Sequence, residues 1–131
     1  MDHTHVDDGR ATEADLTARP EAASIARGLL QTLGHGLNHD VVERARLLVT
    51  EVVSNSVRHG STSEPIHVSV EARPATLHVR VSDSGPSFEP EVHRPGSGSE
   101  SGWGLFLVDA LSDRWGVRSD GDVTVWFEVD L

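Results

Sequence analysis

The spacing of apolar residues changes along this chain of 131 residues, and that change narrows the folds open to it. Between Pro20 and His59 the apolar residues recur every three or four positions, which is the repeat of an amphipathic helix. Between Ile66 and Val81 they recur at every second position, which is the repeat of a strand with one buried face. The sequence therefore predicts helices packed against a sheet.

The predicted elements follow one another in an order that specifies a fold class. The order is helix, helix, two strands, long loop, helix and two strands, and it predicts an α+β two-layer sandwich. We expect a mostly antiparallel, mixed sheet that is covered on one face by about three helices. The expected boundaries are a helix from Pro20 to Gly34, a helix from about Asn38 to His59, a hairpin over 66–81, a loop over 84–101, a helix from about Trp103 to Ser112, and strands near 115–117 and 123–129.

Residues 1–18 are polar and acidic, and they lack either repeat. They are predicted to form a flexible N-terminal tail, which leaves residues 19–131 as a single domain. Within the first helix, Ile25 is expected on the buried face. His67 and His78 fall opposite the apolar residues of their strands, and both are expected at the surface.

The composition excludes several classes of function. The chain has 21 acidic and 11 basic residues, and its net charge of -10 argues against direct binding to nucleic acid or to an anionic membrane. All the basic residues are arginine, so the chain lacks the lysine of a Walker-type phosphate loop. The chain contains no cysteine, which excludes a disulfide scaffold and a thiol nucleophile. Without a signal peptide or a long apolar run, a cytoplasmic location is expected.

The second helix carries two polar residues inside an otherwise apolar run. Glu51 and Asn55 are four positions apart, which places them on one face of a helix with Cβ atoms about 6 Å apart. Burying a carboxylate or an amide beside an apolar core costs free energy unless the group has a hydrogen-bond or charge partner. Taken alone, the pair is explained as well by an exposed helix face. Arg58 and His59 continue the same stripe, and His59 is expected to cap the end of the helix.

Two further motifs flank the long loop. Asp83 and Gly85 follow the second strand of the hairpin, where a carboxylate can accept a hydrogen bond and a glycine lets a ligand approach. By itself this segment is also an ordinary turn. The third helix opens on glycines, whose backbone N–H groups can face an anion. The residues of this opening are Gly102, Trp103, Gly104 and Leu105.

The order of these motifs resembles the GHKL ATP-binding family, whose domain has the Bergerat fold. The segment from Gly104 to Val117 and the closing residues 125–128 are most similar to the stand-alone anti-sigma-factor serine/threonine kinases of actinobacterial type. The resemblance covers about residues 15–131. Two departures are the Pro86-Ser87 pair, where many relatives have a second glycine, and Trp103 in the phosphate-facing turn.

The resemblance implies a role for each motif. Asn55 would coordinate Mg²⁺, and Glu51 would act as the general base. Asp83 would bind the adenine amino group of ATP, with Gly85 giving the base room. Residues 86–101 would close over the nucleotide. The phosphates would be held by Gly102, Trp103, Gly104 and Leu105. Arg58 would either approach a phosphate or cap the C-terminal end of its helix.

The function implied is that of an ATP- and Mg²⁺-dependent serine/threonine protein kinase. It would phosphorylate an anti-anti-sigma-like protein and regulate transcription by partner switching, with a sigma factor as a second partner. The alternative is an ATP-binding interaction module without significant kinase activity, and a third option is a structural domain that binds no nucleotide. By analogy with relatives, a homodimer is also left open.

Overall fold

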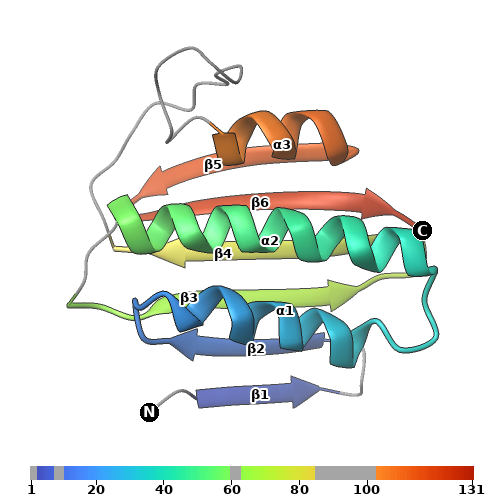
Figure 1. Ribbon diagram of the computed structural model, residues 1–131, viewed down its shortest axis with the longest axis horizontal. Coiled ribbons are helices and arrows are strands. Elements are labelled where there is room, and N and C mark those ends of the chain that lie inside the picture. The colour runs from blue at the N-terminus through green and yellow to red at the C-terminus, as the bar shows by residue number, and fades with distance from the viewer. Residues whose placement is uncertain (1–2, 8–10, 60–62, 85–102) are drawn as a thin grey trace.

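The structure is a computed structural model that describes residues 3–7, 11–59, 63–84 and 103–131. The described residues form three helices and six strands. Figure 1 shows the helices lying over the sheet, with their axes in the same general direction as the strands. The elements are β1 (His3–Asp7), β2 (Ala11–Leu16), α1 (Glu21–Leu33), α2 (His39–His59), β3 (Ile66–Ala72), β4 (Thr76–Asp83), α3 (Trp103–Leu111), β5 (Arg114–Asp120) and β6 (Asp122–Asp130).

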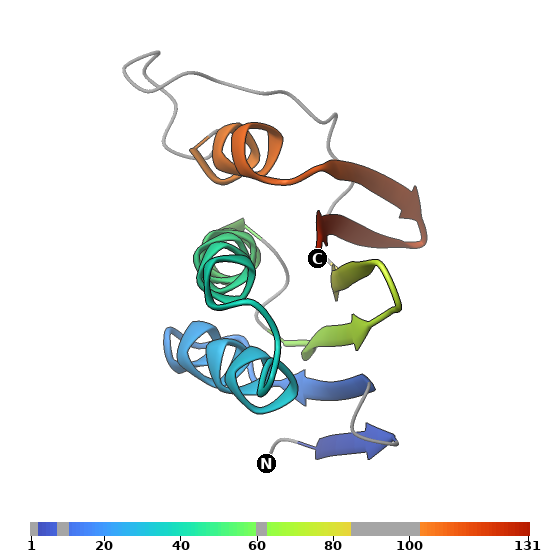
Figure 2. The ribbon, with the colours of Figure 1, turned by 90° about the vertical axis from the view of Figure 1, so that its right-hand side faces the viewer.

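The strands form a six-stranded sheet in the order β1-β2-β3-β4-β6-β5. The helices lie on one side of it, with α2 between α1 and α3 (Figure 2). This arrangement confirms the predicted α+β sandwich. Every pairing between described strands is antiparallel, although a mixed sheet was expected. Among the described connections, short turns join β3 to β4 and β5 to β6, and such connections reverse the chain direction.

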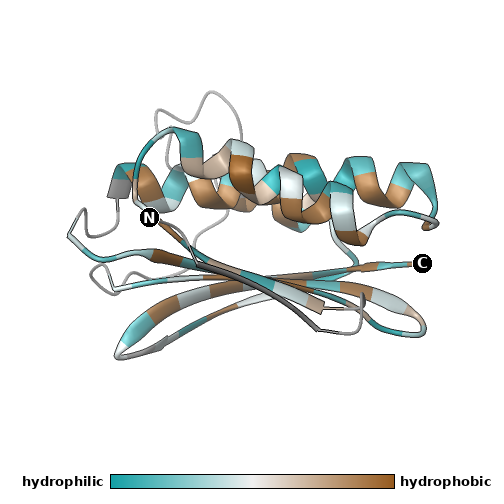
Figure 3. Cartoon of the chain, turned by 90° about the horizontal axis from the view of Figure 1, so that it is seen from below, coloured by the Kyte–Doolittle hydropathy of each residue, from teal (hydrophilic) through white to brown (hydrophobic). Residues whose placement is uncertain are grey.

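The core lies between the helices and the inner face of the sheet, where apolar residues from both layers meet (Figure 3). The predicted alternation holds in the hairpin: Val68, Val70, Val79 and Val81 have at most 1% of their surface exposed. On β6, Phe127 is fully buried against the same helices. Ile25 is an exception to the predicted helix face, because 39% of its surface remains exposed.

The prediction of a flexible tail over residues 1–18 is wrong for the described part of that segment. Residues 11–16 form β2, which pairs with β3 and so joins the centre of the sheet. Ala14 and Leu16 are buried in the core, and Thr12 is buried with them. The strand was missed because its inward residues are small or polar, so that only Leu16 gave a strong apolar signal. Residues 3–7 add β1 outside β2.

The helix ends agree with the boundaries predicted for α1 and α2. Asn38 caps α2, since its Oδ1 accepts hydrogen bonds from the backbone N–H of Asp40 at 2.9 Å and of Val41 at 3.4 Å. Gly34 follows α1, and its N–H donates to the carbonyl of Leu30 at 2.7 Å. Among the described helices, none has the length and apolar character needed to cross a membrane.

Candidate functional site

The helix α2 presents different residues to its two neighbouring helices. On the side of α1, Arg27 Nη1 donates a hydrogen bond to Thr50 Oγ1 at 3.0 Å. Each residue of an α-helix is rotated by about 100° from the one before. Thr50 therefore lies on one flank of the buried face of α2, and Glu51 and Asn55 lie on the other flank of it. Because α2 contacts α1 on one side and α3 on the other, that flank faces α3.

Asn55 has an unsatisfied polar atom on this flank. The residue as a whole is half-buried, but its Oδ1 is fully buried and has no hydrogen-bond partner among the described residues. A buried amide oxygen without a donor is unfavourable, so its retention points to a ligand. An amide oxygen is also a suitable ligand for a hard cation such as Mg²⁺. Asn55 therefore fits the metal role that the family resemblance implies.

The end of β4 supplies the acidic residue of the second motif. Asp83 is the last residue of the strand and is paired with Val123 on β6. It has the same parity as Val79 and Val81, so strand alternation puts it on the face that bears the helices. The residue is half-buried. Figure 1 shows this end of β4 beneath the last turns of α2, which also contacts the strand.

A hollow of about 310 Å³ borders Asp83 at this end of the sheet. Its lining includes Ser82 and His67, which lie on the sheet face away from the helices, and further acidic side chains from three other segments. Such an acidic lining suits a group that donates hydrogen bonds, and it disfavours phosphate. The acidic residues besides Asp83 are Asp15, Glu64 and Asp122.

The third motif is described only in part. Trp103 and Gly104 form the start of α3, which lies in the same half of the molecule as the last turns of α2 (Figure 1). Leu105 is buried in the core, with 5% of its surface exposed, so only its backbone is left to face a ligand. Gly85, Gly102 and the predicted lid over residues 86–101 lie outside the described residues.

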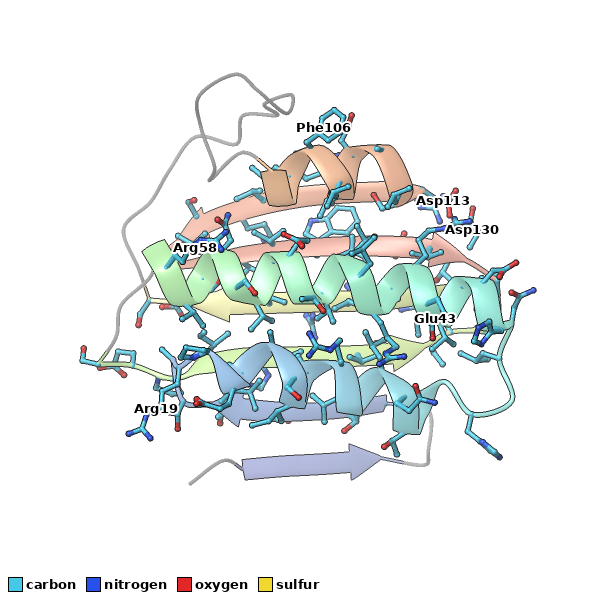
Figure 4. The ribbon with its side chains drawn as sticks, in the orientation of Figure 1. Arg19, Glu43, Arg58, Phe106, Asp113 and Asp130 are labelled. Atoms are coloured by element: carbon cyan, nitrogen blue, oxygen red, sulfur yellow. The ribbon has the colours of Figure 1, made fainter. Side chains whose placement is uncertain are left out.

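Arg58 occupies the last turn of α2 and is exposed. Figure 4 shows its side chain on the side of α2 that faces α3. A cation in this position interacts favourably with the C-terminal end of the helix dipole. The same position leaves the guanidinium group near the end of the sheet where Asp83 lies, so both roles considered for Arg58 remain compatible with the fold.

A polar cluster on the opposite face of the sheet was missed from the sequence. Glu128 of β6 accepts hydrogen bonds from Arg114 Nε at 2.7 Å and from Arg73 Nη1 at 3.2 Å. His78 Nδ1 lies 3.0 Å from the same carboxylate. The hydrogen bond from Arg114, and then that with His78, hold the pKa of Glu128 below its usual value despite burial.

The expectation that both strand histidines are surface residues is correct only for His67. The side chain of His67 is 41% exposed, and its Nδ1 lies 2.7 Å from Asp15 Oδ1. His78 has only 12% of its side chain exposed, because it is stacked against Trp126 and contacts Glu128. Strand alternation gave the correct face for His78, but it carries no information on cross-strand neighbours.

Comparisons with known proteins place these features in context. Residues 12–128 match the family model described as a histidine kinase-like ATPase domain. The serine-protein kinase RsbW of Listeria innocua is 32% identical to this chain, and the alignment covers 84% of this chain and 80% of that protein. The serine-protein kinase RsbW of Bacillus velezensis is 30% identical, with 86% and 81% covered. The corresponding protein of Oceanobacillus iheyensis is 26% identical, with 77% and 74% covered.

Proposed function

The chain belongs to the histidine kinase-like ATPase family, and we propose that it is an ATP-dependent serine/threonine protein kinase of the anti-sigma-factor type. It transfers a phosphoryl group from ATP to a hydroxyl of an anti-anti-sigma-like protein and so regulates transcription by partner switching. The similarity to serine-protein kinases over most of the chain supports the reaction class. The structural observation that carries the proposal is the buried Oδ1 of Asn55, one turn from Glu51, which has no hydrogen-bond partner in the part of the chain that the structure describes.

Two side chains of α2 are assigned to the reaction. When bound, ATP supplies the γ-phosphoryl group and Mg²⁺ offsets the negative charge of the phosphates. Asn55 Oδ1 would be the protein ligand to the cation. The Glu51 carboxylate would accept the proton of the partner's Ser or Thr hydroxyl, whose oxygen would take the γ-phosphoryl group as ADP leaves. Their four-residue spacing keeps the proton acceptor and the metal ligand on adjacent turns of one helix.

The remaining residues hold the nucleotide. An oxygen of the Asp83 carboxylate accepts a hydrogen bond from the adenine amino group, with Gly85 beside the base. Backbone N–H groups at the start of α3 face the phosphates, as helix N-termini commonly do. The chain has no lysine that could contact a phosphate, so an arginine must make any such contact from α2. We assign this contact to Arg58, which lies in the last turn of the helix. The segment 86–101 is proposed to cover the bound nucleotide.

The test compares two glutamates of the same helix. The Glu51→Ala and Glu43→Ala variants are incubated with labelled Mg-ATP and a panel of recombinant anti-anti-sigma-like proteins. Glu43 is exposed and pairs only with Arg46 at 3.0 Å among the described residues, which makes it a matched control. A general base contributes about a hundredfold or more to rate, so Glu51→Ala should lose that factor while ATP affinity is retained.

The outcomes separate the kinase from its alternative. Label on a partner serine or threonine, present with Glu43→Ala and lost with Glu51→Ala, supports the proposal. Equal labelling by the two variants contradicts the role of Glu51. ATP binding without labelling of any partner would instead identify an interaction module whose nucleotide sets the conformation that a partner recognises.

A further inference from the structure

The sheet face away from the helices carries a groove that phosphoryl transfer does not use. Its volume is about 520 Å³, within the range of pockets that bind small molecules. Residues from β3, β4, β5 and β6 contribute to it, and all have the strand parity that points away from the core. The lining residues are His67, His78, Arg80, Ser82, Arg118, Thr124, Trp126 and Glu128.

Aromatic rings form one part of this groove. The rings of Trp126 and His78 have centroids 5.8 Å apart and an interplanar angle of 20°. Gly116 is the cross-strand partner of Trp126 on β5, and a Cβ there would lie 2.7 Å from Trp126 Nε1. The indole therefore lies against the backbone of β5, in space that only glycine leaves open. The groove thus contains a nearly parallel pair of rings on which a planar group can stack.

The charges around the rings favour an anion. Arg80 is the partner of Trp126 on β4; it is exposed and has no ion pair among the described residues. Arg118 lines the groove from β5. The one carboxylate in the lining, that of Glu128, is already shared by Arg73, Arg114 and His78. In a chain of net charge -10, this groove is a local concentration of cationic groups.

We propose that the groove binds a small planar aromatic anion. Its ring stacks on Trp126, and its carboxylate or phosphate group is held by the guanidinium group of Arg80. The groove lies across the sheet from Glu51 and Asn55, so the proposal is independent of the kinase assignment. Two classes of compound carry both a planar aromatic ring and an anionic group: aromatic carboxylates and nucleoside monophosphates.

Binding is measured by NMR on the full chain with saturating Mg-ADP, so that a nucleotide site is already filled. The probes are 2-naphthoate and guanosine 5′-monophosphate, each followed at the indole N–H resonance of Trp126, which is assigned with Trp126→Phe. Two matched compounds each lack one feature: naphthalene-2-methanol has no charge, and cyclohexanecarboxylate has no aromatic ring. We expect saturable shifts with 2-naphthoate, the phosphate or both, and affinities weaker by roughly tenfold for the matched compounds.

The variants test the cationic group. Arg80→Gln should weaken binding of the aromatic anion by roughly tenfold, because a charge-assisted hydrogen bond is lost. Arg19→Gln is the control. Arg19 is also an exposed arginine, but it lies beside the start of α1 and does not line the groove (Figure 4).

Three results would overturn the proposal. Equal affinity of 2-naphthoate for Arg80→Gln and Arg19→Gln is the first, and equal binding of naphthalene-2-methanol is the second. The third is a light-scattering mass of a dimer that becomes monomeric in Trp126→Phe, which would assign the face to a second copy of the chain.

Discussion

At the scale of single residues, Asn55 has a buried polar atom without a partner, as Thr12 and Arg46 also do among the described residues, but Asn55 alone of the three was predicted to bind a ligand. Its Oδ1 is buried and has no hydrogen-bond donor among the described residues. A buried polar atom in that state destabilises a fold by about 1–3 kcal/mol. Stability alone gives no reason for an asparagine on this flank of α2, whereas a bound cation does.

We therefore expect Asn55→Ala to separate stability from binding. The free variant should have a melting temperature equal to or above that of the parent, because an unsatisfied group is removed. The parent should gain about 2.7 kcal/mol with Mg-ATP at a hundredfold excess over Kd, and the variant should lose most of that gain. Thermal unfolding with and without Mg-ATP measures both effects. A full ligand-induced shift in Asn55→Ala would contradict the assignment of this metal ligand.

Glu128 is a residue whose charge matters on the other face of the sheet. Arg114 and His78 lower the pKa of its carboxyl below the ordinary value of 4.5. A carboxyl group with a lowered pKa in the folded state stabilises the fold above its unfolded pKa. That contribution is lost as the pH falls through the folded-state pKa. The contribution of Glu128 is thus complete at neutral pH and disappears in acid below 4.5.

The Glu128→Gln variant should accordingly be less stable at pH 7, by about 1–2 kcal/mol after allowance for the exposed arginine partners. The difference from the parent should shrink as the pH is lowered from 5 toward 3, values chosen roughly to bracket the ordinary carboxyl pKa. Urea unfolding over that range measures it. A constant difference across the series would show that the charge of Glu128 does not contribute.

At the scale of elements, two glycines of the first helical segment have opposite steric surroundings. A Cβ on Gly28, inside α1, would meet no atom within 4 Å. A Cβ on Gly34, just after α1, would lie 2.7 Å from the carbonyl oxygen of Leu30 and 2.7 Å from Val42 Cγ2. Packing therefore does not require a glycine at Gly28. At Gly34, the absence of a side chain allows α1 and α2 to approach closely.

Alanine substitutions at these two positions should change stability in opposite directions. Gly28→Ala should stabilise the protein by about 0.5–1 kcal/mol, because glycine is the poorer helix former. Gly34→Ala should destabilise it by about 1–3 kcal/mol, because the packed neighbours must move. Chemical denaturation of both variants gives the comparison, and effects of equal sign would contradict the packing described at the end of α1.

The elements also show what the sequence could predict. The long helix α2 and the hairpin of β3 and β4 have many strong apolar residues in a clear repeat, and their type was predicted correctly. The end of β4 was placed too early, because the strand continues past Val81 to Asp83. In contrast, β2 is recognisable as a strand only through its pairing with β3. The Glu128 cluster joins residues 50 or more positions apart for two of its contacts, and no local repeat encodes such a meeting.

For the candidate site, the sequence could predict the residues on each element better than their meeting in space. The positions of Glu51 and Asn55 on one flank follow from helical spacing alone. That α2, the end of β4 and the start of α3 share one half of the molecule depends on the sheet order, in which β4 lies beside β6. The resemblance to a known family assigned these residues to one site, but it was not used to predict the strand order.

At the scale of the whole molecule, the strand β2 near the N-terminus contributes to the same core as the helices. Leu16 of β2 is fully buried beneath the helices, and Ala14 is buried beside it. Leu16→Ala should therefore destabilise the protein by about 2–5 kcal/mol, as expected for a large-to-small change in a core. Glu13→Ala on the exposed side of the same strand should change stability by about 0.5 kcal/mol or less.

Urea unfolding followed by circular dichroism distinguishes this expectation from a dispensable tail. A single transition that moves to lower urea in Leu16→Ala, with the slope preserved, identifies β2 as part of the same folding unit. If Leu16→Ala and Glu13→Ala unfold at the same midpoint, the segment does not contribute to the core in solution.

The alternating exposure of β4 restricts how this chain can vary. Val79 and Val81 face the helices, whereas His78 and Arg80 face the groove on the other side. Inserting or deleting one residue within the strand would exchange these sets, sending a guanidinium group into the core and valines into water. Relatives that keep both compartments must therefore keep the length of this segment, and their divergence within it is restricted to replacements that preserve the inward or outward character of each position.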